Sequence, residues 1–418
     1  MKKTRRENPA SLRAYADWGM MMEKKKGQLT MKDLTEIREE IDRVDTSIVA
    51  LYEERMQLAG EVAQYKISNG KPVLDKEREK QKLDHLASLV SGDFLKLGIR
   101  ELFEQIMSMS RKKQYRIMAK QGLLEDTGFE QVQTLSKRGA RVVYQGVEGA
   151  YSHMAAKLFF PKDCEFVQAI TWRDAMEAIA NQKADYAVLP IENSSAGIVS
   201  ENYDLLAEYD VTIVGEQILP VRHCLLGLKD AKISDIEQVY SHPQALMQCS
   251  KFLEQHRDWE RISMKNTAVS AKKIKEDNKP SLAAIASPLT ADLYDLQILK
   301  EGIQNSETNA TRFMIVSSKK IYTKEAKIIS ICFEIKHESG SLYHAISHFI
   351  YNHINMARIE SRPIAGRNWE YRFFVDIEGN LKEEAVLNAL KSLREEVENL
   401  RVLGNYESFY AQGDVTNL

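Results

Sequence analysis

The fold of the N-terminal part is decided by residues 37–66, which read IREEIDRVDTSIVALYEERMQLAGEVAQYK. Apolar side chains recur there at alternating steps of three and four, at Ile37, Ile41, Val44, Ile48, Leu51, Leu58, Val62 and Tyr65. This period is typical of one long amphipathic helix whose apolar stripe faces a partner. One position within the stripe is not apolar, because Arg55 occupies it.

A guanidinium in an apolar seam loses hydration unless an anion meets it, and that anion is either an internal carboxylate or a ligand. Lys66 returns to within about 20° of Arg55 on the helix surface. Arg38 lies about a quarter turn off this face, from where it reaches a neighbouring subunit's site if the helices pair. We therefore expect an anion-binding pocket shared between subunits.

The next segments add further polar groups to this pocket. A second helix is predicted to begin at Asp75. In a third predicted helix, polar residues occupy the last positions of the apolar stripe. Taken singly, each polar residue is most simply a salt-bridge or core group. Together they suit a small dicarboxylate with an ether oxygen, and the set holds no nucleophile or metal ligand, which indicates electrostatic catalysis. The set is Arg38, Arg55, Lys66, Arg78, Glu79, Ser110 and Gln114.

Residues 31–116 resemble the all-helical chorismate mutase domain, in which chorismate rearranges to prephenate without acid, base or covalent intermediate. The resemblance implies that Arg55, Arg78 and the partner subunit's Arg38 hold the substrate carboxylates. It implies that Lys66 and Gln114 flank the ether oxygen. It also implies that the hydroxyl side and the cations are oriented by Asp75, Glu79 and Ser110.

Composition limits the other possibilities. The chain has 418 residues and a net charge of −2 with both signs interspersed, which favours two or three domains and argues against a nucleic-acid or membrane surface. Its four cysteines have neither paired nor metal-ligand spacing, as expected in the reducing cytoplasm. His344 and His348 are one helical turn apart without a third ligand nearby, so we expect no metal and no cofactor. Residues 1–30 lack the apolar run of a signal peptide and are expected to form a flexible extension.

Beyond a linker expected over residues 117–139, short apolar runs alternate with amphipathic helical stretches, a pattern that predicts an α/β unit over residues 140–318. Polar clusters follow several strands, at residues 146–152, 192–197 and 241–244, and residues 309–313 precede another. Each cluster alone is ordinary turn and capping chemistry. Four of them predict a ligand cleft at the strand ends.

This unit resembles prephenate dehydratase, with the two-lobed architecture of periplasmic binding proteins, and Thr311-Arg312-Phe313 is the sharpest part of the match. The resemblance implies that the Thr311 hydroxyl gives a proton to the departing ring hydroxyl of prephenate. Glu192 is a candidate to orient Thr311, and Arg312 a candidate structural residue. The candidates to hold the carboxylates and the keto group are Ser152, Asn193, Ser194, Ser241 and Gln244.

The last hundred residues predict strand, helix, strand, strand, helix, strand, which is the ferredoxin-like α+β order. Residues 325–410 resemble an ACT domain, an amino-acid-sensing module. The resemblance implies a phenylalanine pocket at a subunit interface, built from Gly340, Ser341 and Leu342 with Glu360, Ser361, Arg362 and Pro363.

Together the three resemblances imply a bifunctional chorismate mutase/prephenate dehydratase of phenylalanine biosynthesis, with chorismate and prephenate as substrates and phenylalanine as effector. We expect it to be cytoplasmic and homodimeric. The alternative is a non-catalytic small-molecule sensor with a helical dimerisation segment. Incubation with chorismate and detection of phenylpyruvate separates the two.

Overall fold

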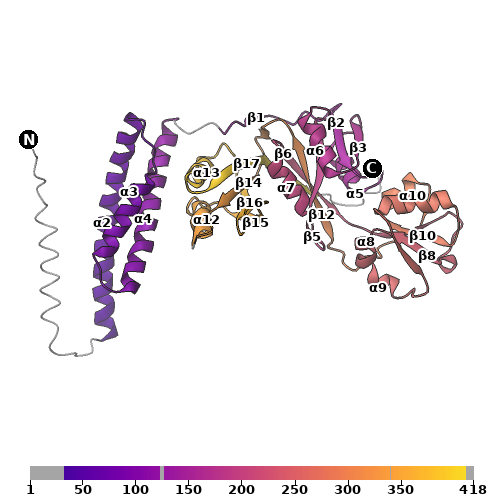
Figure 1. Ribbon diagram of the computed structural model, residues 1–418, viewed down its shortest axis with the longest axis horizontal. Coiled ribbons are helices and arrows are strands. Elements are labelled where there is room, and N and C mark those ends of the chain that lie inside the picture. The colour runs from indigo at the N-terminus through magenta and orange to yellow at the C-terminus, as the bar shows by residue number, and fades with distance from the viewer. Residues whose placement is uncertain (1–32, 123–126, 339, 411–418) are drawn as a thin grey trace, which may run out of the picture.

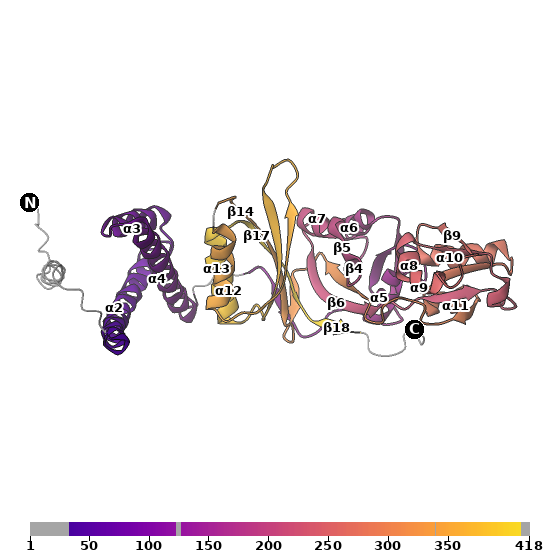
Figure 2. The ribbon, with the colours of Figure 1, turned by 90° about the horizontal axis from the view of Figure 1, so that it is seen from below.

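The computed structural model describes residues 33–122, 127–338 and 340–410. The extension expected over residues 1–30 lies outside these ranges. Four units follow one another along the long axis: a helical unit, the C-terminal unit, and the two lobes of an α/β unit (Figures 1 and 2). The C-terminal unit therefore lies between the helices and the lobes, although it comes last in the sequence.

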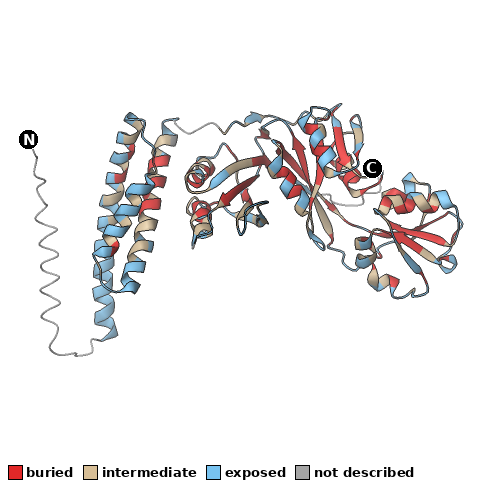
Figure 3. Cartoon of the chain, viewed as in Figure 1, coloured by how far each residue is buried: buried red, intermediate tan, exposed pale blue. Residues whose placement is uncertain are grey.

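The helical unit is formed by α2 (Leu34–Ser68), α3 (Lys76–Ser88) and α4 (Asp93–Lys120). The predicted long helix is confirmed, and α2 buries only Ala59 and Ala63. The apolar stripe of α2 stays exposed, with Ile37 at 40% and Leu51 at 65% (Figure 3). This contiguous apolar face lacks a partner within the described part of the chain.

The linker expected over residues 117–139 contains more regular structure than the sequence suggested. Helix α4 continues to Lys120, because Ile117 and Met118 extend its apolar side. Strand β1 (Glu130–Val132) then pairs in parallel with β13 (Ile321–Thr323).

Lobe 1 carries a sheet in the order β6-β12-β4-β2-β3, with the short β5 against β4. Thr171 and Asp174 form a capping box that starts α6. The elements are β2 (Arg141–Gln145), α5 (Tyr151–Phe159), β3 (Glu165–Ala169), α6 (Trp172–Ala180), β4 (Tyr186–Asn193), β5 (Gly197–Ile198), α7 (Ser200–Glu208), β6 (Thr212–Pro220) and β12 (Ala310–Ser317).

Lobe 2 is inserted between β6 and β12, so the chain crosses between the lobes twice. Its sheet has the order β11-β7-β10-β8-β9. The elements are β7 (Cys224–Gly227), η1 (Ile233–Asp235), β8 (Gln238–Ser241), α8 (Pro243–Gln248), α9 (Ser250–Leu253), β9 (Glu260–Ser263), α10 (Thr267–Asp277), β10 (Leu282–Ala286), α11 (Pro288–Leu293) and β11 (Gln297–Lys300).

The C-terminal unit has the predicted element order, and its strands run β15-β16-β14-β17. Both helices contribute to one apolar cluster on the same face of this sheet, with Phe349 from one and Leu393 from the other. The elements are β14 (Ile328–Ile335), α12 (Ser341–Tyr351), β15 (Met356–Pro363), β16 (Tyr371–Glu378), α13 (Glu384–Glu396), β17 (Glu398–Tyr406) and β18 (Ser408–Tyr410).

The opposite face of the C-terminal sheet packs on lobe 1. Cys332, Phe374 and Leu403 share one buried cluster with lobe 1 side chains such as Ile213. Strand β17 also pairs with β6 at Gly404, where an added Cβ would overlap the carbonyl oxygen of Ile213. Lobe 1 and the C-terminal unit therefore share one continuous sheet and one core. Among the described helices, none is long and apolar enough to cross a membrane.

Candidate active sites

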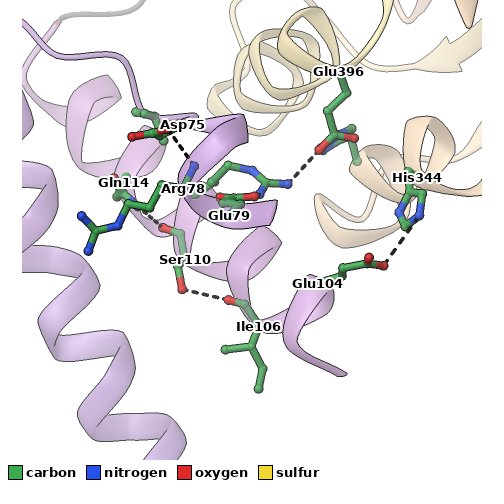
Figure 4. A network of polar contacts seen from close by, with 12 residues as sticks. Asp75, Arg78, Glu79, Glu104, Ile106, Ser110, Gln114, His344 and Glu396 are labelled. Atoms are coloured by element: carbon green, nitrogen blue, oxygen red, sulfur yellow. Dashed lines mark hydrogen bonds and ion pairs between the residues drawn. The ribbon is translucent and has the colours of Figure 1, made fainter. Parts of the chain in front are cut away.

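A cavity of about 540 Å³ opens between the three helices of the helical unit. Helix α2 contributes Arg55 and Lys66, the turn and α3 contribute Asp75, Arg78 and Glu79, and α4 contributes Ser110 and Gln114. Seven of the eight residues proposed for this site from the sequence therefore line one cavity. Asp75 also caps α3 by accepting a hydrogen bond from the Arg78 backbone nitrogen at 3.1 Å (Figure 4).

The two cations of α2 that line the cavity, Arg55 and Lys66, are held by neutral groups. The guanidinium of Arg55 donates to the Ser110 hydroxyl and, at 3.2 Å, to the Ile106 carbonyl oxygen. The Lys66 ammonium donates to the Val73 carbonyl oxygen. Burial lowers the pKa of both Arg55 and Lys66, and the nearby Glu79 carboxylate opposes that effect only in part. A bound anion would therefore stabilise both cations.

Glu79 and Gln114 lie on the inner side of the cavity. Glu79 accepts a hydrogen bond from the Arg111 guanidinium, a neighbour that the sequence did not single out. Gln114 donates to the Ser110 carbonyl oxygen at 3.2 Å, and its side-chain oxygen is buried without a partner among the described residues. Buried polar atoms of this kind point to a missing ligand or water.

Arg38 is the exception among the eight. It lies on α2, about 25 Å from Arg55 along the helix axis at 1.5 Å per residue. Its side chain is exposed and is not part of the cavity. Within one chain, then, Arg38 cannot contribute to the pocket.

A second cavity, of about 410 Å³, lies between the two lobes of the α/β unit. Of the proposed residues, it brings together Ser152, Asn193, Gln244 and Thr311. Three of the segments around it follow β2, β4 and β8, as the polar clusters predicted, but Thr311 lies within β12 and not before its strand. Tyr151 and His242 also line the cavity; they lie in the predicted polar clusters but were not singled out. Sequence reasoning missed four further lining residues, namely His223, Gln248, Asn266 and Thr267.

Thr311 is oriented by Asn193 across the β4–β12 ladder, where the two residues are direct partners. The backbone nitrogens of Ser195 and Ala196 donate to Asn193 Oδ1 at 3.0 and 2.9 Å. Those contacts turn the amide nitrogen toward Thr311, and Asn193 Nδ2 donates to Thr311 Oγ1 at 2.9 Å. Because Oγ1 accepts this bond, the hydroxyl proton of Thr311 stays available to the cavity.

Two proposed substrate contacts do not line this cavity. The Ser241 side chain is fully buried and donates to the Ile285 carbonyl oxygen at 2.7 Å. The Ser194 hydroxyl accepts from the Ala310 nitrogen at 3.0 Å and fastens the loop beside Thr311. A serine at a strand end can form a hydrogen bond either with the backbone of a loop or with a ligand, and the sequence pattern did not distinguish these two roles.

Glu192 does not orient Thr311. Successive residues of a strand face opposite sides of the sheet, so Glu192 and Arg312 lie on the side away from the cavity. Glu192 forms ion pairs there with Arg312, at 3.5 Å, and with Arg358 of the C-terminal unit. Arg312 also pairs with Glu216 and, at 3.2 Å, with Asp376 of β16. Arg312 thus has the structural role that was considered for it.

The two segments expected to form a regulatory pocket lie at one end of the C-terminal sheet. Tyr371 pairs with both Ile335, just before the Gly340 segment, and Pro363. Gly340 adopts a φ of 83° and precedes α12, and the Ser341 hydroxyl donates to the Glu338 carbonyl oxygen. Arg362 forms a bidentate pair with Asp204 of lobe 1, at 3.1 and 2.7 Å.

Comparison with known families matches both catalytic units. The model of chorismate mutase type II matches residues 37–115, and the model of prephenate dehydratase matches residues 142–321. A bifunctional chorismate mutase/prephenate dehydratase of Enterobacter agglomerans is 34% identical over 90% of this chain and 96% of its own length.

Two solved structures each resemble 64% of this chain. A prephenate dehydratase from Arthrobacter aurescens, in complex with L-Phe, has a TM-score of 0.60 and 28% identity over 64% of this chain and 89% of its own. A quorum-quenching acylase, GqqA, has a TM-score of 0.59 and 29% identity over 64% of this chain and 98% of its own. One fold thus serves two chemistries, so the activity must be argued from the sequence relatives and the site. Because the match to the bifunctional relative spans both units, this chain belongs to the family of bifunctional chorismate mutase/prephenate dehydratases and has both activities.

Proposed function

We propose that the helical cavity rearranges chorismate to prephenate and that the interlobe cavity converts prephenate to phenylpyruvate, in the biosynthesis of phenylalanine. The observation that supports the first assignment best is the pair Arg55 and Lys66, half-buried cations held only by neutral oxygens at a cavity wall. A dicarboxylate supplies the missing negative charge. The rival role of a non-catalytic sensor does not fit the family of this chain.

In the helical cavity the reaction needs positioning and charge stabilisation rather than proton transfer. Arg55 and Arg78 hold the two carboxylates of chorismate and select the diaxial conformer. Lys66 and Gln114 donate hydrogen bonds to the ether oxygen as its bond to carbon breaks and negative charge grows there. Asp75, Glu79 and Ser110 orient the cations and the ring hydroxyl.

The mutase site is completed by a second copy of the chain. The exposed stripe of α2 supports a homodimer, since an apolar face of this length is buried when two such helices pair. Within one chain, Arg38 cannot reach the pocket. A paired α2 helix from the second copy would bring the partner subunit's Arg38 toward it.

In the interlobe cavity, Thr311 protonates the ring hydroxyl of prephenate as it departs. The carbon–oxygen bond breaks and water leaves, while the ring carboxylate leaves as carbon dioxide and its bonding electrons complete the aromatic ring. Asn193 Nδ2 stabilises the negative charge that grows on Thr311 Oγ1, and solvent then returns the proton. Ser152 and Gln244 remain the candidates to hold the substrate's polar groups.

We also propose that the C-terminal unit is an ACT domain that binds phenylalanine. Its ferredoxin-like strand order and the convergence of the Gly340 and Pro363 segments at one sheet end support this role. The Arthrobacter aurescens relative was solved with L-Phe. Binding would lower dehydratase activity by favouring a less competent state of the cleft.

A cytoplasmic location completes the proposal. Cys164, Cys224, Cys249 and Cys332 are buried free thiols. Such thiols are typical of proteins from reducing compartments, which supports this location.

Replacing Arg55 with alanine is expected to lower mutase turnover by about a hundredfold or more, because one preorganised cation of the pocket is lost. Dehydration of supplied prephenate should stay near the wild-type rate, since the two cavities are built from separate segments, and this activity serves as the folding control. Arg55→Lys should recover part of the mutase rate. Equal loss of both activities in a folded Arg55→Ala variant would contradict separate sites.

Replacing Thr311 with valine keeps the shape and the strand propensity but removes the hydroxyl. Dehydratase kcat should fall on the order of a hundredfold or more, with KM for prephenate little changed, while Thr311→Ser retains much of the rate. Mutase turnover of the same preparations is the control. A valine variant with near-normal dehydratase kcat would show that another group delivers the proton.

Phenylalanine should bind the wild-type protein in calorimetry and inhibit the dehydratase. Gly340→Asp and Gly340→Asn form a matched pair, because both carry the same positive φ and the same Cβ contact with His344. The aspartate variant should lose more of the response than the asparagine variant, since only the former adds a charge. If the folded protein does not bind phenylalanine at millimolar concentration, the C-terminal unit is a structural module and not a regulatory one.

A further inference from the structure

Helix α4 of the helical unit packs against α13 of the C-terminal unit, and side chains of α4 also reach α12. Figure 2 shows that both C-terminal helices face the helical unit. Gln105 donates to the Tyr343 hydroxyl at 3.0 Å, and the Lys112 ammonium sits 3.1 Å from the centre of the Tyr351 ring. At the rim of this interface Arg116 pairs with Glu384 at 3.6 Å, and both side chains are exposed. The mutase unit and the C-terminal unit are therefore in direct contact.

Arg111 is the buried centre of this interface. Its guanidinium donates to Glu79 on one side and, at 2.7 Å, to Glu396 of α13 on the other. Figure 4 labels these two glutamates. The second oxygen of Glu396 lies 2.8 Å from Nε2 of His348, whose side chain is 2% exposed. Four side chains thus form one line from the mutase cavity to the interior of the C-terminal unit.

This line also forms a wall between two cavities. Glu79 and Arg111 line the mutase cavity, and both also line an interdomain cavity of about 320 Å³. Ser341, of the proposed regulatory segment, also lines that interdomain cavity. Through Glu396, α13 therefore contacts the same guanidinium that donates to Glu79 in the mutase cavity.

The electrostatics agree with a guanidinium that depends on both carboxylates. Burial lowers the pKa of Arg111, but Glu79 and Glu396 outweigh it and raise the pKa above its ordinary value. Burial raises the pKa of Glu396, while His348 and Arg111 outweigh it and lower that pKa. Without Glu396, the Arg111 guanidinium would keep only Glu79 as a carboxylate partner and would be less firmly held.

We propose that Arg111 is a positioning residue for the mutase reaction, and that Glu396 of the C-terminal unit holds it in place. The C-terminal unit of the same chain then supports the mutase site in addition to the second copy, and mutase turnover follows the state of that unit. This inference rests on the assignment of the helical cavity as the mutase site.

The first test compares Glu396→Gln with Glu384→Gln, since both remove an α13 carboxylate that pairs with an α4 arginine. Glu396→Gln should lower mutase kcat on the order of fivefold, with KM for chorismate and dehydratase activity nearly unchanged. Glu384→Gln should stay within about twofold of wild type. Equal effects of the two variants, or no effect of Glu396→Gln, would overturn the proposal.

The second test asks whether the effect passes through Arg111. Arg111→Gln should lower mutase kcat and Arg111→Lys should restore part of it, because a cation again faces Glu79. In the Arg111→Gln background, adding Glu396→Gln should cause no further loss. A full additional loss in the double variant would show that Glu396 acts by another route, and would overturn the coupling.

A Glu79→Gln variant separates this inference from the assignment on which it rests. If Glu79→Gln abolishes mutase turnover while Glu396→Gln leaves it intact, the site stands and the coupling is wrong. If Glu79→Gln retains full turnover, the assignment of the cavity itself fails, and the positioning role of Arg111 fails with it.

Discussion

The ladder between β4 and β12 is the constraint on which the dehydratase half depends. Its register sets Thr311 beside Asn193 on the cavity side and Arg312 beside Glu192 on the opposite side. One residue of slip would exchange the two faces and bury the proton donor among ion pairs. Arg312 resists that slip, because a buried guanidinium separated from its carboxylates costs several kcal/mol. Strand β12 thus carries the Thr311 hydroxyl on one face. On the other face it carries Arg312, which pairs with Asp376 of the C-terminal unit.

That arrangement makes the C-terminal unit part of both catalytic units. It shares a sheet and a core with lobe 1, and the Arg358–Glu192 pair reaches the strand that carries Asn193. Its helices meet α4 at Arg111 on the other side. The helical unit and the C-terminal unit lie at opposite ends of the sequence, but the structure places the two in contact. A ligand that shifts this unit has a physical route to either reaction.

Local periodicity predicted part of the mutase pocket, and the resemblance to the chorismate mutase domain supplied Asp75 and the role of each residue. The three-and-four spacing aligned Arg55 with Lys66, and the breaks in the stripe of α4 singled out Ser110 and Gln114. Arg111 was not predictable, since it sits in the basic run Arg111-Lys112-Lys113 and its partner Glu396 is 285 residues away. In the cleft, Ser241 and Glu192 were misplaced because strand ends show which residues are polar but not which side they face.

The account rests on one chain that performs two consecutive reactions in two cavities. The most direct measurement is to incubate the purified protein with chorismate alone and follow the solution by proton NMR. The account predicts that prephenate appears first and that aromatic signals of phenylpyruvate replace it. Chorismate that stays unchanged, or prephenate that accumulates without conversion beyond its spontaneous rate, would contradict it.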